Sequence, residues 1–368
     1  MKENKTKLKK KRKYGFLKNS LSNKNIEKKC INYFNKHGFC VIDGVIPNKE
    51  IIRIRNEIII AQKKIGDNVK KIKGLINSNK FSEKDLLSNR TIKLRSTGRE
   101  GRLAKPVNDI VWMPGFAKYL GNSNLVKLSK ILLDDHVRIA QIHPKIIPSD
   151  INKSYPEISM GNDYFGLPRL YKGPITARDW HTDWPHDPSA SGGGNPDENI
   201  GFIRQPFPDV TMCLVIIFYL NDVDEKSGGT WAVPGSHKDK RNPRGPKDKI
   251  TLTAPIQGET QIKAKAGSVF IQDSRLWHSS PLRNLSKKDR VAVVSRWCPW
   301  WLSIDEFAPK SRFNIVCRPL NQNEFLKLPK NLQPYMKHLC HKESNTIQKP
   351  LLDYSKAAAE RTRWAHKK

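Results

Sequence analysis

The sequence predicts a mainly β protein with flanking helices (α+β), whose short strands form a sandwich or barrel of jelly-roll size. The first observation is a series of short β-type runs, separated by Gly and Pro turns, that begins at residue 136. The second is helical spacing of apolar residues in residues 26–135. The third is composition, because 368 residues with 37% hydrophobic content suffice for a sizeable core.

The N-terminal half opens with a predicted helix–strand–helix unit. IEKKCINYFNKHG has apolar residues at helical spacing and stops at Gly38. FCVIDGVI (39–46) is typical of a short strand, and NKEIIRIRNEIIIAQKKI is typical of an amphipathic helix that begins at Asn48. Residues 67–135 are mixed and mostly helical in pattern.

Six runs form the predicted jelly roll, and a long loop between Pro185 and Pro208 could cover a site. The runs are HVRIAQIHPKII (136–147), GPITARDWHTDW (173–184), DVTMCLVIIFYL (209–220), GGTWAVPGSH (228–237), AGSVFIQDSRLWH (266–278) and RVAVVSRWCPW (290–300). We therefore expect a basic, disordered tail over 1–25, a main domain over 26–310 with its jelly-roll core at 136–300, and a helical, polar extension over 311–368.

Charge is the most unusual global property of the chain. The net charge is +32, and it comes mainly from 46 Lys against 21 Arg. Such a field attracts nucleic acid or anionic surfaces, but an AT-rich genome produces the same Lys-rich composition. The block KLKKKRK near the N-terminus fits a nuclear-localisation or nucleic-acid patch, and it fits a solvated tail equally well.

Cysteine usage and hydropathy indicate the compartment. The six cysteines are scattered without a C-x-x-C pair, which favours a reducing environment. The longest apolar run, TMCLVIIFYL, is too short to span a bilayer and is typical of a buried strand. We expect a cytoplasmic protein, with a nuclear location left open by the basic tail.

The candidate metal site lies in DWHTDWPHD (179–187). His181 and Asp183 are two residues apart, so a strand would project both side chains from one face. His278 lies at the end of a later predicted strand that begins after the turn at Gly267. Two His and one carboxylate on one face of an octahedral ion leave three positions open, which is the arrangement of non-heme Fe(II) oxygenases.

An H-x-D pattern is weak evidence by itself, because the chain contains a second one at His237–Asp239. That copy opens the charged stretch KDKRNPRGPKDK, which favours an exposed loop. Around the first copy, Asp179 is a candidate partner that orients an imidazole. His186 and Asp187 follow Pro185, and we expect them at the pocket rim or in solvent.

Four tryptophans, Trp180, Trp184, Trp231 and Trp277, flank the candidate ligands in sequence. Buried core packing is the simpler expectation for each, and a role as pocket wall is the alternative.

Taken together, four separated motifs resemble the phytanoyl-CoA dioxygenase family of Fe(II)/2-oxoglutarate-dependent oxygenases. They are NYFNKHGFCVIDGVIPNKEI, QIHPKIIP with the WHTD that follows it, FYLNDVDEKSGGTWAVPGSHK, and WHSSPLRNLSKKDRVAVVSRW. The resemblance runs from about Ile31 to Trp301. It implies a double-stranded β-helix (jelly-roll) core that binds Fe(II), 2-oxoglutarate and O₂, with His181, Asp183 and His278 as the metal ligands.

The resemblance also implies a site for the co-substrate. Arg290, twelve residues after His278, falls where the family places the arginine that binds the distal carboxylate of 2-oxoglutarate. This spacing is one residue longer than is typical, so Arg283 and Arg296 are alternatives, the first too close to the metal and the second too far along the strand. Ser280 matches a position that helps to hold the same carboxylate, and Gln141 resembles a polar residue near the other end of the co-substrate.

Family halogenases lack the carboxylate ligand, and the presence of Asp183 therefore favours hydroxylation or another C–H oxidation. The resemblance favours a small-molecule substrate. Two alternatives stay open, namely a 2-oxoglutarate oxygenase acting on nucleic acid or protein, and an inactive jelly-roll binding protein. The oligomeric state and the identity of the substrate cannot be read from the sequence.

Overall fold

The protein is described from a computed structural model. The described residues are 16–17, 26–77, 94–95, 102–103, 108–149, 151, 158–162, 168–171, 178–186, 203, 205–243, 254–280, 283–302 and 320–341. Most of the loop at 185–208 and most of the segments 1–25 and 311–368 lie outside them. No helix among these residues is long and apolar enough to cross a membrane.

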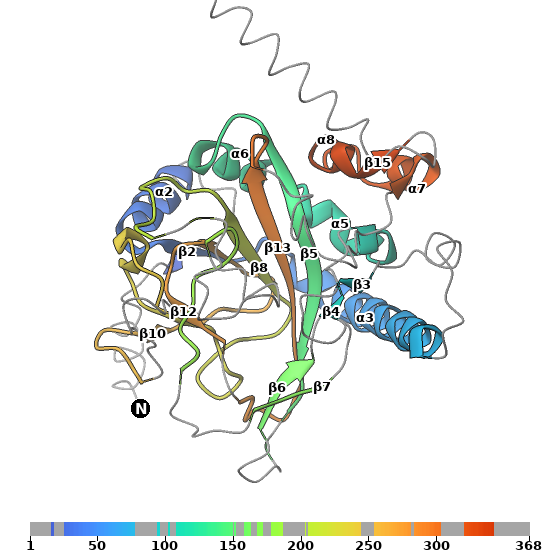
Figure 1. The fold of residues 1–368 in the computed structure, drawn as a ribbon, viewed down its shortest axis with the longest axis horizontal. Coiled ribbons are helices and arrows are strands. Elements are labelled where there is room, and N and C mark those ends of the chain that lie inside the picture. Colours follow the sequence, from blue (N-terminus) through green and yellow to red (C-terminus); the bar gives the residue numbers. More distant parts are fainter. Residues whose placement is uncertain are drawn as a thin grey trace, which may run out of the picture.

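Two antiparallel sheets form the core (Figure 1). The main sheet has the order β1-β2-β11-β8-β13-β5, and only its edge pair β1–β2 is parallel. Its strands are β1 (Phe16–Leu17), β2 (Phe39–Ile42), β11 (Val269–Asp273), β8 (Leu214–Tyr219), β13 (Arg290–Pro299) and β5 (Val137–Ile147). The smaller sheet has the order β10-β9-β12, from Thr260–Gln261, Trp231–Ala232 and His278–Ser279.

Successive side chains along the strands of the main sheet point to opposite faces, so the sheet separates two hydrophobic cores. Phe39, Tyr219, Phe270 and Ala292 face inward and pack with Ala232 of the smaller sheet and with Ile262 and Leu276, which lie next to its strands in sequence. Their neighbours Ile42, Ile216, Ile271 and Val293 face outward, into a second core that helices cover. The prediction of a mainly β protein with a jelly-roll core and flanking helices is confirmed.

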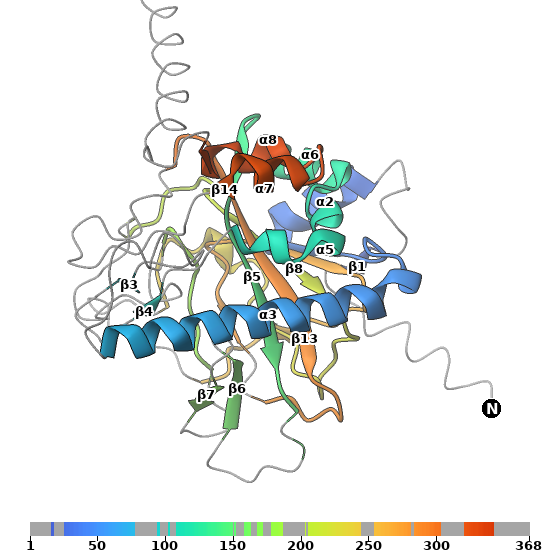
Figure 2. The same cartoon turned by 90° about the vertical axis from the view of Figure 1, so that its right-hand side faces the viewer.

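The helices lie over the outer face of the main sheet. α2 (Ile26–His37) ends at Gly38, whose φ of 81° allows the turn into β2, as the sequence predicts. α3 (Asn48–Asn77) begins at the predicted residue and is longer than the predicted pattern, and Figure 2 shows it lying across β5 and β13. η1 (Asn108–Trp112), α5 (Pro114–Leu120) and α6 (Ser123–Leu132) complete this layer.

The remaining elements are short. β3 (Leu94–Arg95) pairs with β4 (Arg102–Leu103), and β6 (Ile158–Asn162) pairs with β7 (Pro168–Tyr171). β14 (Leu320–Asn321), α7 (Gln322–Lys327), α8 (Gln333–Met336), η5 (Lys337–Leu339) and β15 (Cys340–His341) lie near the C-terminus. Leu320, Leu328, Leu332 and Met336 belong to the outer core, so this part of the C-terminal segment packs on the same fold.

The C-terminal segment also buries a titratable group, and this predicts a pH effect on stability. Burial, together with the charge of Arg138, lowers the pKa of His338 to about 3. Below pH 6.5 the unfolded chain therefore binds a proton that the folded chain does not. The free energy of unfolding consequently decreases as the pH is lowered. Between pH 7 and pH 5 we expect His338 to contribute a loss of about 2 kcal/mol.

Urea unfolding of the parent and of His338→Leu at both pH values measures this contribution. The variant should lose about 2 kcal/mol less than the parent over the same interval. Equal losses in the two proteins would show that His338 does not carry the effect.

Candidate metal centre

His181 and His278 are joined through their backbones at the open edge of the smaller sheet. The backbone N–H of each donates to the carbonyl of the other, at 3.0 Å in both directions. The ring centroids lie 4.2 Å apart. The sequence predicts a full strand through this region, but among the described residues only this single bridge forms, because the N–H of Asp183 turns to the carbonyl of Ser274 at 2.7 Å.

His181, Asp183 and His278 offer one ligand atom each, and these atoms all lie within 4.8 Å of one another. All three residues are buried. This group, which we call the triad, is the only set of three or more His, Cys, Asp or Glu residues suited to a metal among the residues that the structure describes.

Backbone carbonyls orient both imidazoles of the triad. Nδ1 of His181 lies 2.6 Å from the carbonyl oxygen of Asp179, and Nδ1 of His278 lies 2.9 Å from that of Leu276. A carbonyl only accepts, so Nδ1 carries the proton in each ring and Nε2 keeps its lone pair for a metal. The contact that orients His181 is therefore made by the backbone of Asp179, whereas the prediction rested on the direction of its side chain.

The carboxylate of the triad is held in its charged form. Burial by itself would raise the pKa of Asp183, but the guanidinium of Arg296, followed by His278 and His181, holds this pKa well below its usual range. Nη2 of Arg296 donates to Oδ1 of Asp183 at 2.7 Å, and both side chains are buried. The carboxylate is therefore ready to bind a cation without first losing a proton.

Arg290 lies on the same face of β13 as Arg296, because the two are six positions apart, which is an even number. It is 4% exposed, and its Nε and Nη1 atoms have no hydrogen-bond partner among the described residues. Burial lowers its pKa to about 10, which still leaves it charged at neutral pH. A buried cation with unpaired donors fits an anionic ligand.

The other predicted co-substrate residues are placed as follows. Ser280 is half-buried, and its Oγ accepts from Nζ of Lys145 at 3.1 Å. Gln141 pairs with Arg296 in the β5–β13 register, but its side chain lies outside the described part of the structure. Arg283 is half-buried in the loop after β12.

The prediction that His186 could lie in solvent is wrong, and the second H-x-D lies outside any strand, as predicted. His186 is 1% exposed, so it is not in solvent; its Nδ1 lies 3.3 Å from Oγ of Ser274, and burial lowers its pKa to about 4. His237 is also buried, in the short helix η4 (Ser236–Lys238), whereas Asp239 is half-buried and paired with Arg241. Only the histidine of this second H-x-D is therefore buried. Asp187 lies outside the described residues.

The tryptophans follow the core expectation in three of four cases. Trp180, Trp184 and Trp277 are buried, and the indole N–H groups of Trp180 and Trp277 donate to the carbonyls of Ala254 and Arg241. Trp231 is half-buried, and the guanidinium of Arg178 stacks 4.0 Å from its ring centroid.

Three contacts near the site are not predicted from the sequence. Arg296 contacts Asp183; Gln272 has its Nε2 atom 3.5 Å from Oδ2 of Asp183; and Lys145 contacts Ser280. Even spacing from Arg290 marks Arg296 as a residue of the same strand face. No comparable signal in the sequence marks Gln272 or Lys145.

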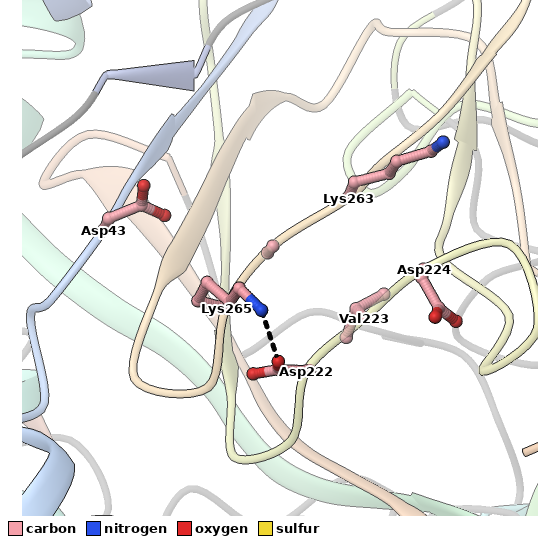
Figure 3. Close-up of a pocket in the computed structure, with 7 residues that line it drawn as sticks. Asp43, Asp222, Val223, Asp224, Lys263 and Lys265 are labelled. Atoms are coloured by element: carbon pink, nitrogen blue, oxygen red, sulfur yellow. Dashed lines mark hydrogen bonds and ion pairs between the residues drawn. The ribbon is translucent and has the colours of Figure 1, made fainter. Parts of the chain in front are cut away.

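A hollow in the protein is lined by residues other than those of the triad. Figure 3 shows this hollow, which is lined by Asp43, Asp222, Val223, Asp224, Lys263, Ala264 and Lys265. Its carboxylates already have partners within the protein, since Asp222 pairs with Lys265 at 2.7 Å and Asp43 accepts from Ser268. Asp224 accepts from the backbone of its own turn. The hollow therefore offers no carboxylate that lacks a partner.

Comparison with known proteins finds a family model and several solved structures that are similar to this chain. Residues 165–292 match the family model described as phytanoyl-CoA dioxygenase (PhyH). The uncharacterized proteins Rv1501 of Mycobacterium tuberculosis and Mb1539 of Mycobacterium bovis are each 33% identical over 110 residues, which is 29% of this chain and 37% of either relative. The match thus spans well under half of the relatives' length.

Among solved structures, HygX from Streptomyces hygroscopicus with nickel and 2-oxoglutarate bound is 14% identical, with a TM-score of 0.42 over 75% of this chain and 88% of that one. AviO1 from Streptomyces viridochromogenes is 16% identical, with a TM-score of 0.41 over 75% and 96%. Likeness at this level assigns no function. The family match is more specific, and the matched residues 165–292 contain the triad and Arg290.

Proposed function

We propose that the protein is an Fe(II)- and 2-oxoglutarate-dependent dioxygenase that hydroxylates a small-molecule substrate. One observation carries the proposal, namely that the same jelly-roll core holds a His–Asp–His triad and a buried arginine with unpaired donors. Either feature alone also occurs in proteins without such an activity. Their combination matches the two halves of a site that binds a metal and a dicarboxylate together.

The triad suits Fe(II) by the chemistry of its donors. Two imidazole nitrogens and one carboxylate oxygen form the facial set that leaves three positions of an octahedral ion open. The hydrogen bonds from Nδ1 to the Asp179 and Leu276 carbonyls hold both rings with Nε2 available. The match of residues 165–292 to the phytanoyl-CoA dioxygenase family model favours iron over zinc, which also accepts His and carboxylate ligands.

Arg290 suits the distal carboxylate of 2-oxoglutarate. Its planar guanidinium can donate two parallel hydrogen bonds to a carboxylate, and burial strengthens such a pair. Ser280, with its neighbour Lys145, supplies further donors near the same strand end. A dicarboxylate that bridges Arg290 and the metal would satisfy the unpaired Nε and Nη1 atoms.

When bound, Fe(II) with 2-oxoglutarate supplies the activation of O₂, and 2-oxoglutarate is converted to succinate and CO₂. The chain contributes orientation and exclusion of water. Asp183 and Arg290 fix the charges at the two ends of the co-substrate site, while the buried Trp180 and Trp184 flank the ligand segment. We expect the loops at the open end of the jelly roll to determine which substrate binds.

An anaerobic titration tests this function. Intact protein should show a visible metal-to-ligand absorption band only when Fe(II) and 2-oxoglutarate are both present, and admission of O₂ should then produce succinate. The absence of the band would reject the proposal. A band without succinate would favour an inactive binding protein.

A further inference from the structure

Next to the metal centre, residues of three neighbouring strands of the main sheet form one row across the sheet. Gln272 of β11 pairs with Val215 of β8, and Val215 pairs with Arg296 of β13. Residues that pair directly in an antiparallel sheet project from the same face. Gln272 and Arg296 therefore reach the same region from either side of Val215, and both approach Asp183.

The two oxygens of Asp183 have different surroundings. Oδ1 accepts from Nη2 of Arg296 at 2.7 Å. Oδ2 lies 3.5 Å from Nε2 of His278, which is the nitrogen that faces the metal position, and 3.5 Å from the amide of Gln272. One oxygen is thus bound by a buried cation, and the other lies beside a second ligand atom of the triad.

We propose that Arg296 is a positioning residue that binds Oδ1 of Asp183 and leaves Oδ2 as the single ligand atom of this carboxylate. The inference rests on the proposed function, because it concerns how many positions the metal keeps open. The side chains of Arg296 and Asp183 are 5% and 4% exposed, so water does not compete well for Oδ1.

Restriction to one oxygen matters because carboxylates also bind metals through both oxygens. Three protein atoms on a six-coordinate ion leave three positions, which is enough for two atoms of 2-oxoglutarate and one of O₂. A carboxylate bound through both oxygens would leave only two, and 2-oxoglutarate would fill them. Arg296 would therefore keep the position for O₂ available.

Water-proton relaxation by bound Mn²⁺ tests this role without any turnover, since it reports the number of water molecules on the ion. The parent protein should hold three and should keep one after 2-oxoglutarate binds. Arg296→Gln frees Oδ1, so the relaxation per bound Mn²⁺ should fall by about a third, and no water should remain in the complex with 2-oxoglutarate. Arg296→Lys restores a cation and should return toward the parent value.

Arg178→Gln is the matched control, because it breaks a different, half-buried arginine–carboxylate pair, with Glu259 at 2.8 Å. It should leave the relaxation at the parent value. Equal relaxation in the parent and Arg296→Gln overturns the inference, and so does a loss of equal size in Arg178→Gln. If Arg296→Gln does not fold, Arg296→Met is measured in its place. A fall of about a third in the relaxation per bound Mn²⁺ is again expected, and relaxation equal to that of the parent overturns the inference. Failure of the parent to bind Mn²⁺ would instead reject the proposed function.

Discussion

Replacement of His181 by alanine is expected to weaken Fe(II) binding by at least about 100-fold and to abolish succinate formation. Loss of a partner that only orients a metal ligand already costs about 10- to 100-fold in metal affinity, so loss of a ligand atom should cost more. The fold should survive, because the backbone bonds that join His181 to His278 do not involve the imidazole. Calorimetric titration with Fe(II) or Mn²⁺ under anaerobic conditions measures the affinity.

His136→Ala is the control for the removal of a histidine, since its side chain is 58% exposed and His136 is not part of the triad. It should bind the metal as the parent does. Asp239→Asn provides a second comparison, because Asp239 belongs to the other H-x-D pattern. Parent-like affinity in His181→Ala, or a loss in Asp239→Asn, would mean that the wrong pattern has been assigned to the metal.

The long, regular elements of the fold could be predicted because their periodicity is set by burial on one side. The end of α2 at Gly38, the start of α3 at Asn48 and the strands β5, β8 and β13 fall where the apolar pattern puts them. The smaller sheet could be predicted only in part, because β9 lies within the predicted run 228–237 whereas β10 lies outside all six runs. Its strands are two residues long, and so short a run has no period to detect.

The segment around His181 shows a further limit. Its pattern is typical of a strand, but Asp183 bonds to the turn at Ser274 while His181 bonds to His278. These partners are about a hundred residues away in sequence, and tertiary pairing decides which of them each N–H finds. The sequence could nevertheless predict that His181 and Asp183 lie close together. Their H-x-D spacing brings the two side chains together in this irregular geometry as well as in a strand.

The contacts beneath the triad depend on register, which no local pattern contains. Arg296 lies beside Asp183 because β13 pairs with β8 at the level of Val215, and Gln272 meets the same carboxylate from β11. In the sequence, Arg296 is only an arginine too far along its strand for the co-substrate. The structure gives Arg296 a different partner, the metal ligand itself.

Replacement of Arg290 by methionine is expected to have opposite effects on stability and on ligand binding. Nε and Nη1 of Arg290 are buried without partners among the described residues, and each such donor costs about 1–3 kcal/mol in the folded state. A methionine of similar length removes that cost, so the ligand-free variant should be more stable than the parent. Binding of 2-oxoglutarate should weaken by about 100-fold, because two charge-assisted hydrogen bonds are lost at about 1.5 kcal/mol or more each.

Urea unfolding of the ligand-free proteins and anaerobic titration of the Fe(II)-loaded proteins with 2-oxoglutarate measure the two effects. Arg178→Met is the informative comparison, because Arg178 is paired with Glu259 and stacked on Trp231. It should lose stability and keep its affinity for 2-oxoglutarate, which is the reverse of Arg290→Met. An Arg290→Met protein that is less stable than the parent and binds 2-oxoglutarate equally well would make Arg290 a structural residue. The carboxylate site would then have to be sought elsewhere in the barrel, first at Lys145 and Ser280.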